Sequence, residues 1–85
     1  EMNRFTYNRI VHLNAALREK ELPYRIDYRD EHTAGIWPLG ICASIGREEE
    51  MRAEIRNFFR KEGVEIFFTE DGTRICTAER NGETE

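Results

Sequence analysis

The chain lacks long hydrophobic runs and has few cysteines, prolines and tryptophans. Its 85 residues include two cysteines, two prolines and one tryptophan. No apolar run approaches the roughly 20 residues that a membrane-spanning helix needs. The sequence also shows no basic segment followed by an apolar one that would act as a leader, so we expect a soluble, cytoplasmic protein. Two cysteines do not make a disulfide framework, and we expect free thiols in that compartment.

An excess of positive charge and a glycine-rich phosphate loop are also missing. Thirteen lysines and arginines stand against 17 aspartates and glutamates, which gives a net charge of −4. A weakly acidic body repels phosphate backbones at long range, which disfavours nucleic acid as a partner. Gly35, Gly40 and Gly46 are spaced wrongly for either common phosphate-binding fingerprint. We therefore expect no nucleotide cofactor.

The hydrophobic pattern that is present repeats one order twice, a helix followed by two strands. Helices are predicted over residues 3–21 and 47–62, and strands over residues 24–30, 36–45, 64–69 and 73–78. Asn3 is the predicted N-cap of the first helix. This order predicts an α+β fold, αββαββ, in which a four-stranded antiparallel sheet carries both helices on one face of a two-layer sandwich. We expect one domain over residues 2–78 and a disordered polar tail over residues 79–85.

The second predicted helix carries both signs of charge on its exposed side. Glu48 and Arg52 have the spacing of a favourable i, i+4 ion pair. Arg52, Arg56 and Arg60 form a stripe at the same spacing, and glutamates surround it. The mixture indicates a solvated, salt-bridged surface rather than an anion site.

The last two strands are predicted to form a hairpin, and their register defines an uncovered face of the sheet. Asp71-Gly72 is the signal of a two-residue turn, which would pair Glu70 with Thr73 and Phe67 with Cys76. Alternation along the strands then predicts the residues of the face opposite the helices: Arg25, Asp27, Arg29, Cys42, Phe67, Arg74 and Cys76. Trp37 belongs to the alternate row of the strand that holds Cys42.

The uncovered face is the predicted site of function. One exposed aromatic is also an ordinary feature of a wet sheet face. As a docking surface, however, the face would use Phe67 as its apolar anchor and Arg25, Arg29 and Arg74 as polar groups that orient a partner. We therefore expect a non-catalytic binding or regulatory module that contacts a protein partner or forms a homodimer through this face.

Two alternatives use the cysteines. His32, Cys42 and Cys76 are residue types that bind zinc, but their spacing matches no finger or ribbon pattern, and we expect no metal. Cys42 with His32 would suit a small cysteine-dependent enzyme. Nothing in the sequence supplies an orienting third group or an oxyanion site, so catalysis is the weaker hypothesis.

Several short motifs are similar to those of one known family. They are Leu13-Asn14, Leu22-Pro23, Arg29-Asp30, Trp37-Pro38-Leu39, Cys42-Ala43, Phe58-Phe59 and Glu70-Asp71. With these motifs the chain resembles RDAC, a family of small uncharacterised bacterial proteins named after an Arg-Asp-Ala-Cys motif. The family's Ala-Cys is Glu31-His32 here, and its Cys-Ala-Cys is Cys42-Ala43-Ser44. These departures argue against a cysteine-based metal or redox role for this chain, although His32 could replace a thiolate ligand, and the resemblance implies no activity.

Overall fold

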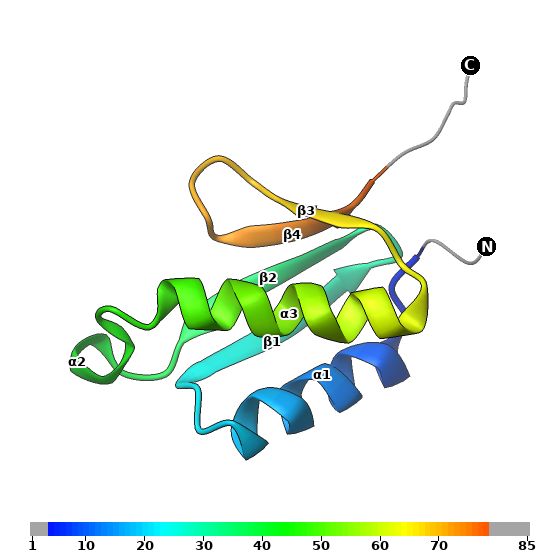
Figure 1. Ribbon diagram of the computed structural model, residues 1–85. Coiled ribbons are helices and arrows are strands. Elements are labelled where there is room, and N and C mark those ends of the chain that lie inside the picture. Colours follow the sequence, from blue (N-terminus) through cyan, green and yellow to red (C-terminus); the bar gives the residue numbers. More distant parts are fainter. Residues whose placement is uncertain (1–3, 79–85) are drawn as a thin grey trace.

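The computed structural model describes residues 4–78 of the chain. In chain order the elements are α1 (Tyr7–Glu19), β1 (Tyr24–Asp30), β2 (Thr33–Pro38), α2 (Ile41–Ser44), α3 (Glu48–Glu62), β3 (Ile66–Phe68) and β4 (Arg74–Thr77). The strands form an antiparallel sheet in the order β1-β2-β4-β3. Both long helices lie in front of this sheet in Figure 1, which confirms the predicted α+β fold. The predicted tail, residues 79–85, lies outside the described residues.

The first helix begins later than the sequence predicted. Its N-cap is Thr6, whose Oγ1 accepts a hydrogen bond from the Arg9 amide at 3.1 Å, and the predicted cap, Asn3, lies outside the described residues. The Phe5 amide donates to the Glu31 carbonyl at 2.6 Å, so the segment before Thr6 is held against the β1–β2 turn. Phe5 therefore enters the core from the segment before the helix, and it is fully buried.

The core lies between the two helices and the near face of the sheet. Buried side chains recur at helical spacing on each long helix: Ile10, Leu13 and Leu17 on α1, and Met51, Ile55 and Phe59 on α3. The sheet contributes the following buried residues: Tyr24, Ile26, Ala34, Ile36 and Ile75. One apolar layer therefore fills the space between helices and strands, and nothing from α1 or α3 covers the opposite face.

The second strand differs most from its prediction. It runs over Thr33–Pro38 rather than residues 36–45, and the chain then turns away into the short helix α2, which was not predicted. Gly35 lies before the predicted start of this strand, but it pairs with Asp27 on one side and Arg74 on the other. Ala34 and Ile36 fill the core, so Trp37 lies on the open face. Cys42 is exposed on α2, and its predicted place on that face is wrong.

The β3–β4 hairpin has the predicted register but a longer turn. Phe67 pairs with Cys76, as predicted. The Thr69 amide donates to the Arg74 carbonyl at 3.0 Å, and the Gly72 amide donates back to the Thr69 carbonyl at 2.9 Å. The loop therefore spans residues 70–73, and the predicted closing pair of Glu70 with Thr73 is wrong. The hydrogen bonds that Asp71 accepts inside the loop favour this wider turn.

Candidate functional site

The open face of the sheet is defined by the pairing of its strands. Arg25 lies opposite Trp37, and Arg74 lies opposite Gly35. Residues opposite each other in an antiparallel pair share a face, so these side chains project from the side that the helices leave uncovered. Asp27, Thr33, Cys76 and Phe67 share that face through the same ladders.

A hollow occupies the middle of this face because Gly35 has no side chain. We call it the Gly35 hollow, a cavity of about 380 Å³, and its lining residues are Arg29, Gly35, Ile36, Trp37, Pro38, Thr73 and Arg74. A Cβ atom placed on Gly35 would lie 3.4 Å from Trp37 Nε1 and 3.5 Å from Arg29 Nε. The indole N–H and the guanidinium therefore come together directly over the glycine.

A β-bulge in β1 accounts for the position of Arg29. The pairing shifts between Tyr28 and Asp30, so Arg29 is an extra residue that has no partner of its own on β2. A bulge bends its strand and re-aims the side chain beside it. Here the Arg29 guanidinium reaches across β2, where Nη2 lies 3.6 Å from the Cβ position of Gly35.

Three arginines of this face have guanidinium groups with no hydrogen-bond or ion-pair partner within residues 4–78: Arg25, Arg29 and Arg74. Several arginines elsewhere are held by carboxylates. Arg47 Nε lies 2.7 Å from Glu50 Oε1, and Arg9 Nε lies 3.2 Å from Glu62 Oε1. The open face thus presents guanidinium groups whose hydrogen-bonding capacity is available to a ligand.

One carboxylate near the Gly35 hollow, that of Asp71, already accepts hydrogen bonds from its own turn. Asp71 Oδ1 accepts hydrogen bonds from the Thr73 amide at 3.1 Å, the Thr69 hydroxyl at 2.8 Å and the Thr73 hydroxyl at 2.9 Å. The Thr73 backbone and these two hydroxyls hold the pKa of Asp71 below its usual value, and the charge of Arg74 contributes in the same direction. Asp71 therefore stays ionised as part of the turn. Asp27 lies on the face itself, opposite Gly35.

The structure places all four predicted partner-binding residues on the open face, but in two groups. Arg25, Arg29 and Arg74 lie around Trp37 and Gly35, on β1, β2 and β4. Phe67 lies on β3, at the edge of the sheet, with 49% of its surface exposed. The open face therefore carries two half-exposed aromatic side chains, because Trp37 is 48% exposed.

Sequence reasoning missed Trp37 and Gly35. The apolar residues Ala34 and Ile36 alternate with them along β2. A predicted strand that began before Gly35 would have shown from this alternation that Ala34 and Ile36 face the core and that Trp37 faces outward. Nothing in the sequence pointed to Thr73 or to the bulge at Arg29.

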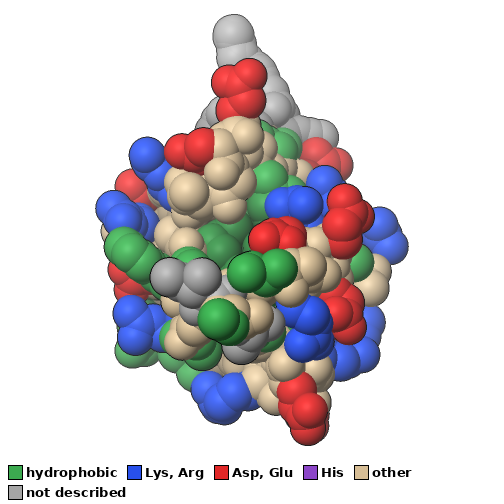
Figure 2. Space-filling model, turned by 90° about the vertical axis from the view of Figure 1, so that its left-hand side faces the viewer, with side chains coloured by type: hydrophobic (Ala, Val, Ile, Leu, Met, Phe, Trp, Pro, Cys, Tyr) green, Lys and Arg blue, Asp and Glu red, His purple; other side chains and the backbone are tan. Residues whose placement is uncertain are grey.

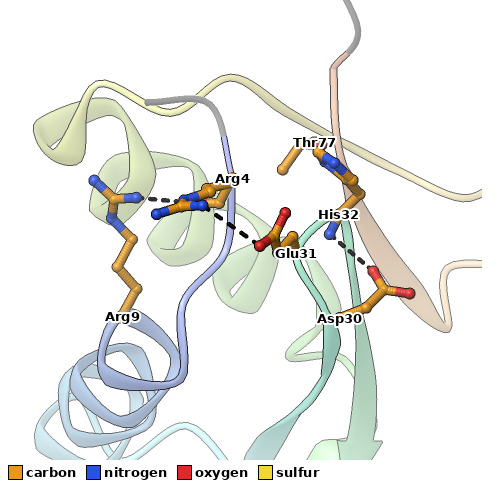
Figure 3. Close-up of polar contacts among 6 residues, drawn as sticks. All are labelled: Arg4, Arg9, Asp30, Glu31, His32 and Thr77. Carbon is orange, nitrogen blue, oxygen red and sulfur yellow. Dashed lines mark hydrogen bonds and ion pairs between the residues drawn. The ribbon is translucent and has the colours of Figure 1, made fainter. Parts of the chain in front are cut away.

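The residues of the zinc and enzyme alternatives are not brought together. His32 lies at the β1–β2 turn, where its amide donates to Asp30 Oδ1 at 2.8 Å and its Nδ1 lies 2.8 Å from Thr77 Oγ1; Figure 3 shows this corner. Cys42 lies beyond the opposite end of β2, a strand length of about 20 Å away. Both thiols are free. Within residues 4–78 no group of three or more His, Cys, Asp or Glu side chains is arranged to hold a metal ion.

The arginine stripe on α3 makes local contacts. Arg52 Nη2 lies 3.8 Å from Glu49 Oε2, so the predicted pairing of Arg52 with Glu48 is wrong. The Arg56 guanidinium lies 4.8 Å from the centre of the Phe68 ring. These contacts fit the predicted salt-bridged surface.

Hydrophobic side chains also gather at the end of the molecule that carries α2, with charged side chains around them (Figure 2). The strongly exposed members include Leu39 and Ile45. Over the part of the chain that the structure describes, no helix has the length and apolar character needed to cross a membrane.

Comparisons of the chain with protein-family models, curated proteins and solved structures found no match. The resemblance to the RDAC family therefore stays a prediction.

Proposed function

We propose that the chain is a small, non-catalytic binding module whose open sheet face docks an acidic, partly apolar segment of another protein. The observation that carries the proposal is a single face with three arginines whose guanidinium groups have no hydrogen-bond or ion-pair partner within residues 4–78. Two half-exposed aromatic side chains, Trp37 and Phe67, lie on the same face. Arginine and large aromatics are the residue types enriched where protein interfaces bind tightly.

Charge favours a different protein over a second copy of this chain. In a twofold symmetric dimer the same surface patch meets itself. A face-to-face dimer would bring the arginine groups of both copies together, and like charges across an interface cost free energy. An acidic partner gains from the same arrangement, because guanidinium groups bind carboxylates with two parallel hydrogen bonds.

The two unpaired thiols fit a reducing compartment such as the cytoplasm, which we propose as the setting. Membership of the RDAC family is likewise a proposal, and it carries no activity. Catalysis through Cys42 and His32 is disfavoured, because these residues lie at opposite ends of β2.

The experiment measures binding of a fluorescent peptide of about ten residues with the repeat Glu-Ser-Leu-Ser, because residues at alternate positions of an extended segment point to the same side and glutamate and leucine then share one face. Arg25→Gln and Phe67→Ala should each weaken binding by about three- to tenfold, because the first removes a charge-assisted hydrogen bond and the second an apolar contact. Arg18→Gln on α1 is the matched control, since Arg18 is exposed and is not on the sheet. It should change binding by less than about twofold.

Three outcomes would overturn the proposal. The first is equal binding of a peptide in which Gln replaces every Glu. The second is a loss in Arg18→Gln as large as that in Arg25→Gln. The third is tighter binding of a ten-nucleotide oligouridine, which would assign the face to single-stranded nucleic acid instead.

A further inference from the structure

We infer that the Gly35 hollow binds a small carboxylate ligand with a planar apolar body, such as an aromatic acid. The inference goes beyond the proposed protein partner, because such a ligand fits within the hollow and does not need the rest of the face. The hollow, at about 380 Å³, lies within the size range of small-molecule sites in proteins.

The donors around the hollow suit an anion. Arg29 lies over Gly35, and Arg74 lies opposite Gly35 on β4. Trp37 Nε1 is the nearest atom to the Cβ position of Gly35, at 3.4 Å, and no acceptor within residues 4–78 bonds to it. Two guanidinium groups and an indole N–H thus face one small space. A guanidinium offers a planar pair of N–H groups that matches the two oxygens of a carboxylate.

The apolar wall of the hollow is the Trp37 side chain, which is 48% exposed and suits a flat ring. Ile36 and Pro38 also border the hollow, although the Ile36 side chain belongs to the core. An indole face pairs favourably with another aromatic ring when the two are offset or edge to face. A ligand with a carboxylate at one end and a ring at the other would therefore satisfy both kinds of wall.

A carboxylate fits better than a phosphate. Phosphate sites usually add backbone N–H groups, from a helix N-terminus or a loop, to the charged side chains. The backbone at Gly35 is already part of the sheet, with Asp27 paired on one side and Arg74 on the other. A group with a single negative charge also suffers less repulsion from Asp27 and from Asp71 at the nearby turn.

The hollow exists because position 35 is glycine, and the backbone does not require glycine there. The glycines with positive φ in the described chain are Gly46, Gly63 and Gly72, so Gly35 has a conformation that other residues adopt. A β-branched residue in a strand interior is favourable. Its Cβ would lie 3.4 Å from Trp37 Nε1 and 3.5 Å from Arg29 Nε, so its γ carbons would displace both side chains from over residue 35. Gly35→Val should therefore disrupt the hollow while keeping the fold.

Trp37 gives a direct readout, because it is the only tryptophan of the chain. Benzoate is the probe, and we expect it to change the Trp37 fluorescence in a saturable way. Benzamide has the same shape without the charge and should bind at least about tenfold more weakly, since a hydrogen bond to a charged group is worth more than one to a neutral group. Phenyl phosphate tests the other anion.

Gly35→Val should abolish saturable benzoate binding. Arg29→Gln should weaken it by at least about fivefold, because the variant loses the planar pair of guanidinium N–H groups that binds both carboxylate oxygens. Arg18→Gln, the control of equal charge change, should leave it within about twofold. Thermal melting of Gly35→Val confirms that the variant is folded. The inference is overturned if benzamide binds as well as benzoate, if folded Gly35→Val binds benzoate like the original chain, or if phenyl phosphate binds tenfold tighter.

Arg25 separates this inference from the proposed function. Arg25 faces the docking surface but does not line the hollow. Arg25→Gln should therefore lose affinity for the acidic peptide and keep its affinity for benzoate to within about twofold. A chain that binds benzoate but no peptide would retain the small-molecule site and refute the docking proposal, and the reverse result would do the opposite.

Discussion

Asn14 joins helix α1 to the edge of the sheet with both ends of its side-chain amide. Its Nδ2 donates to the Ile26 carbonyl at 2.9 Å, and its Oδ1 accepts from the Ile26 amide at 2.7 Å. These backbone groups point outward from β1, which is an edge strand and would otherwise leave them open to another strand. One side chain thus satisfies the strand and fixes where α1 lies, although the sequence showed only a polar residue beside the apolar stripe.

Replacing Asn14 by alanine should lower the free energy of unfolding by about 1–3 kcal/mol, because two half-buried backbone groups lose their partners. Urea denaturation measures the change. Asn8→Ala is the control, since Asn8 lies exposed on the same helix, and its effect should stay within about 0.5 kcal/mol. Equal losses in the two variants would show that helix propensity, and not the contact with β1, sets the result.

At the scale of an element, the β3–β4 turn is organised by one carboxylate. Asp71 collects one amide and two hydroxyl donors from Thr69 and Thr73, which fixes residues 70–73 as a loop. The same loop positions Thr73 and Arg74 at the rim of the Gly35 hollow. A tight two-residue turn would leave these two residues in a different place, so the longer turn helps to form the site.

The low pKa of Asp71 predicts a pH dependence of stability. A carboxylate whose pKa is depressed by folding stabilises the protein above the pKa of the unfolded chain, and this stabilisation is lost as the pH falls through the folded value. Asp71→Asn should therefore be less stable than the original chain at pH 7, and the difference should shrink in acid, below about pH 4. Thermal melts across this range test it, and a difference that grows as the pH falls would contradict the assignment.

At the scale of the whole molecule, two layers leave one surface of the sheet without a cover. The helices bury one apolar layer, and the opposite face carries arginines, two aromatics and a hollow. The predicted regulatory or binding role depends on this asymmetry. Because the charges of the face oppose pairing with itself, the uncovered surface should remain exposed in the isolated protein.

We therefore expect the purified chain to sediment as a monomer at micromolar concentration and physiological salt. Phe67→Ala should also be monomeric and should lower the free energy of unfolding by less than about 1 kcal/mol, since half of the ring is exposed. A dimer that dissociates in the Phe67→Ala variant would instead show that a second copy occupies the face.

Local chemistry in the sequence determined much of this molecule. Apolar spacing located both long helices, and alternation placed Arg25 and Asp27 on the outer side of β1. The alternation of side chains along the strands, together with the turn signal, also predicted the pairing of Phe67 with Cys76. Each of these features depends on residues that are close together in the chain, so a short window of sequence is enough to predict it.

Tertiary contacts decided the features that form the site. Ala34 and Ile36 face inward because α3 and β4 supply the core beside them, and this turns Trp37 outward. The bulge brings Arg29 over Gly35 only because β1 and β2 pair on both sides of it. The hollow depends on residues from three strands. The packing of the whole sheet brings these residues together, and no single segment of the chain could do so.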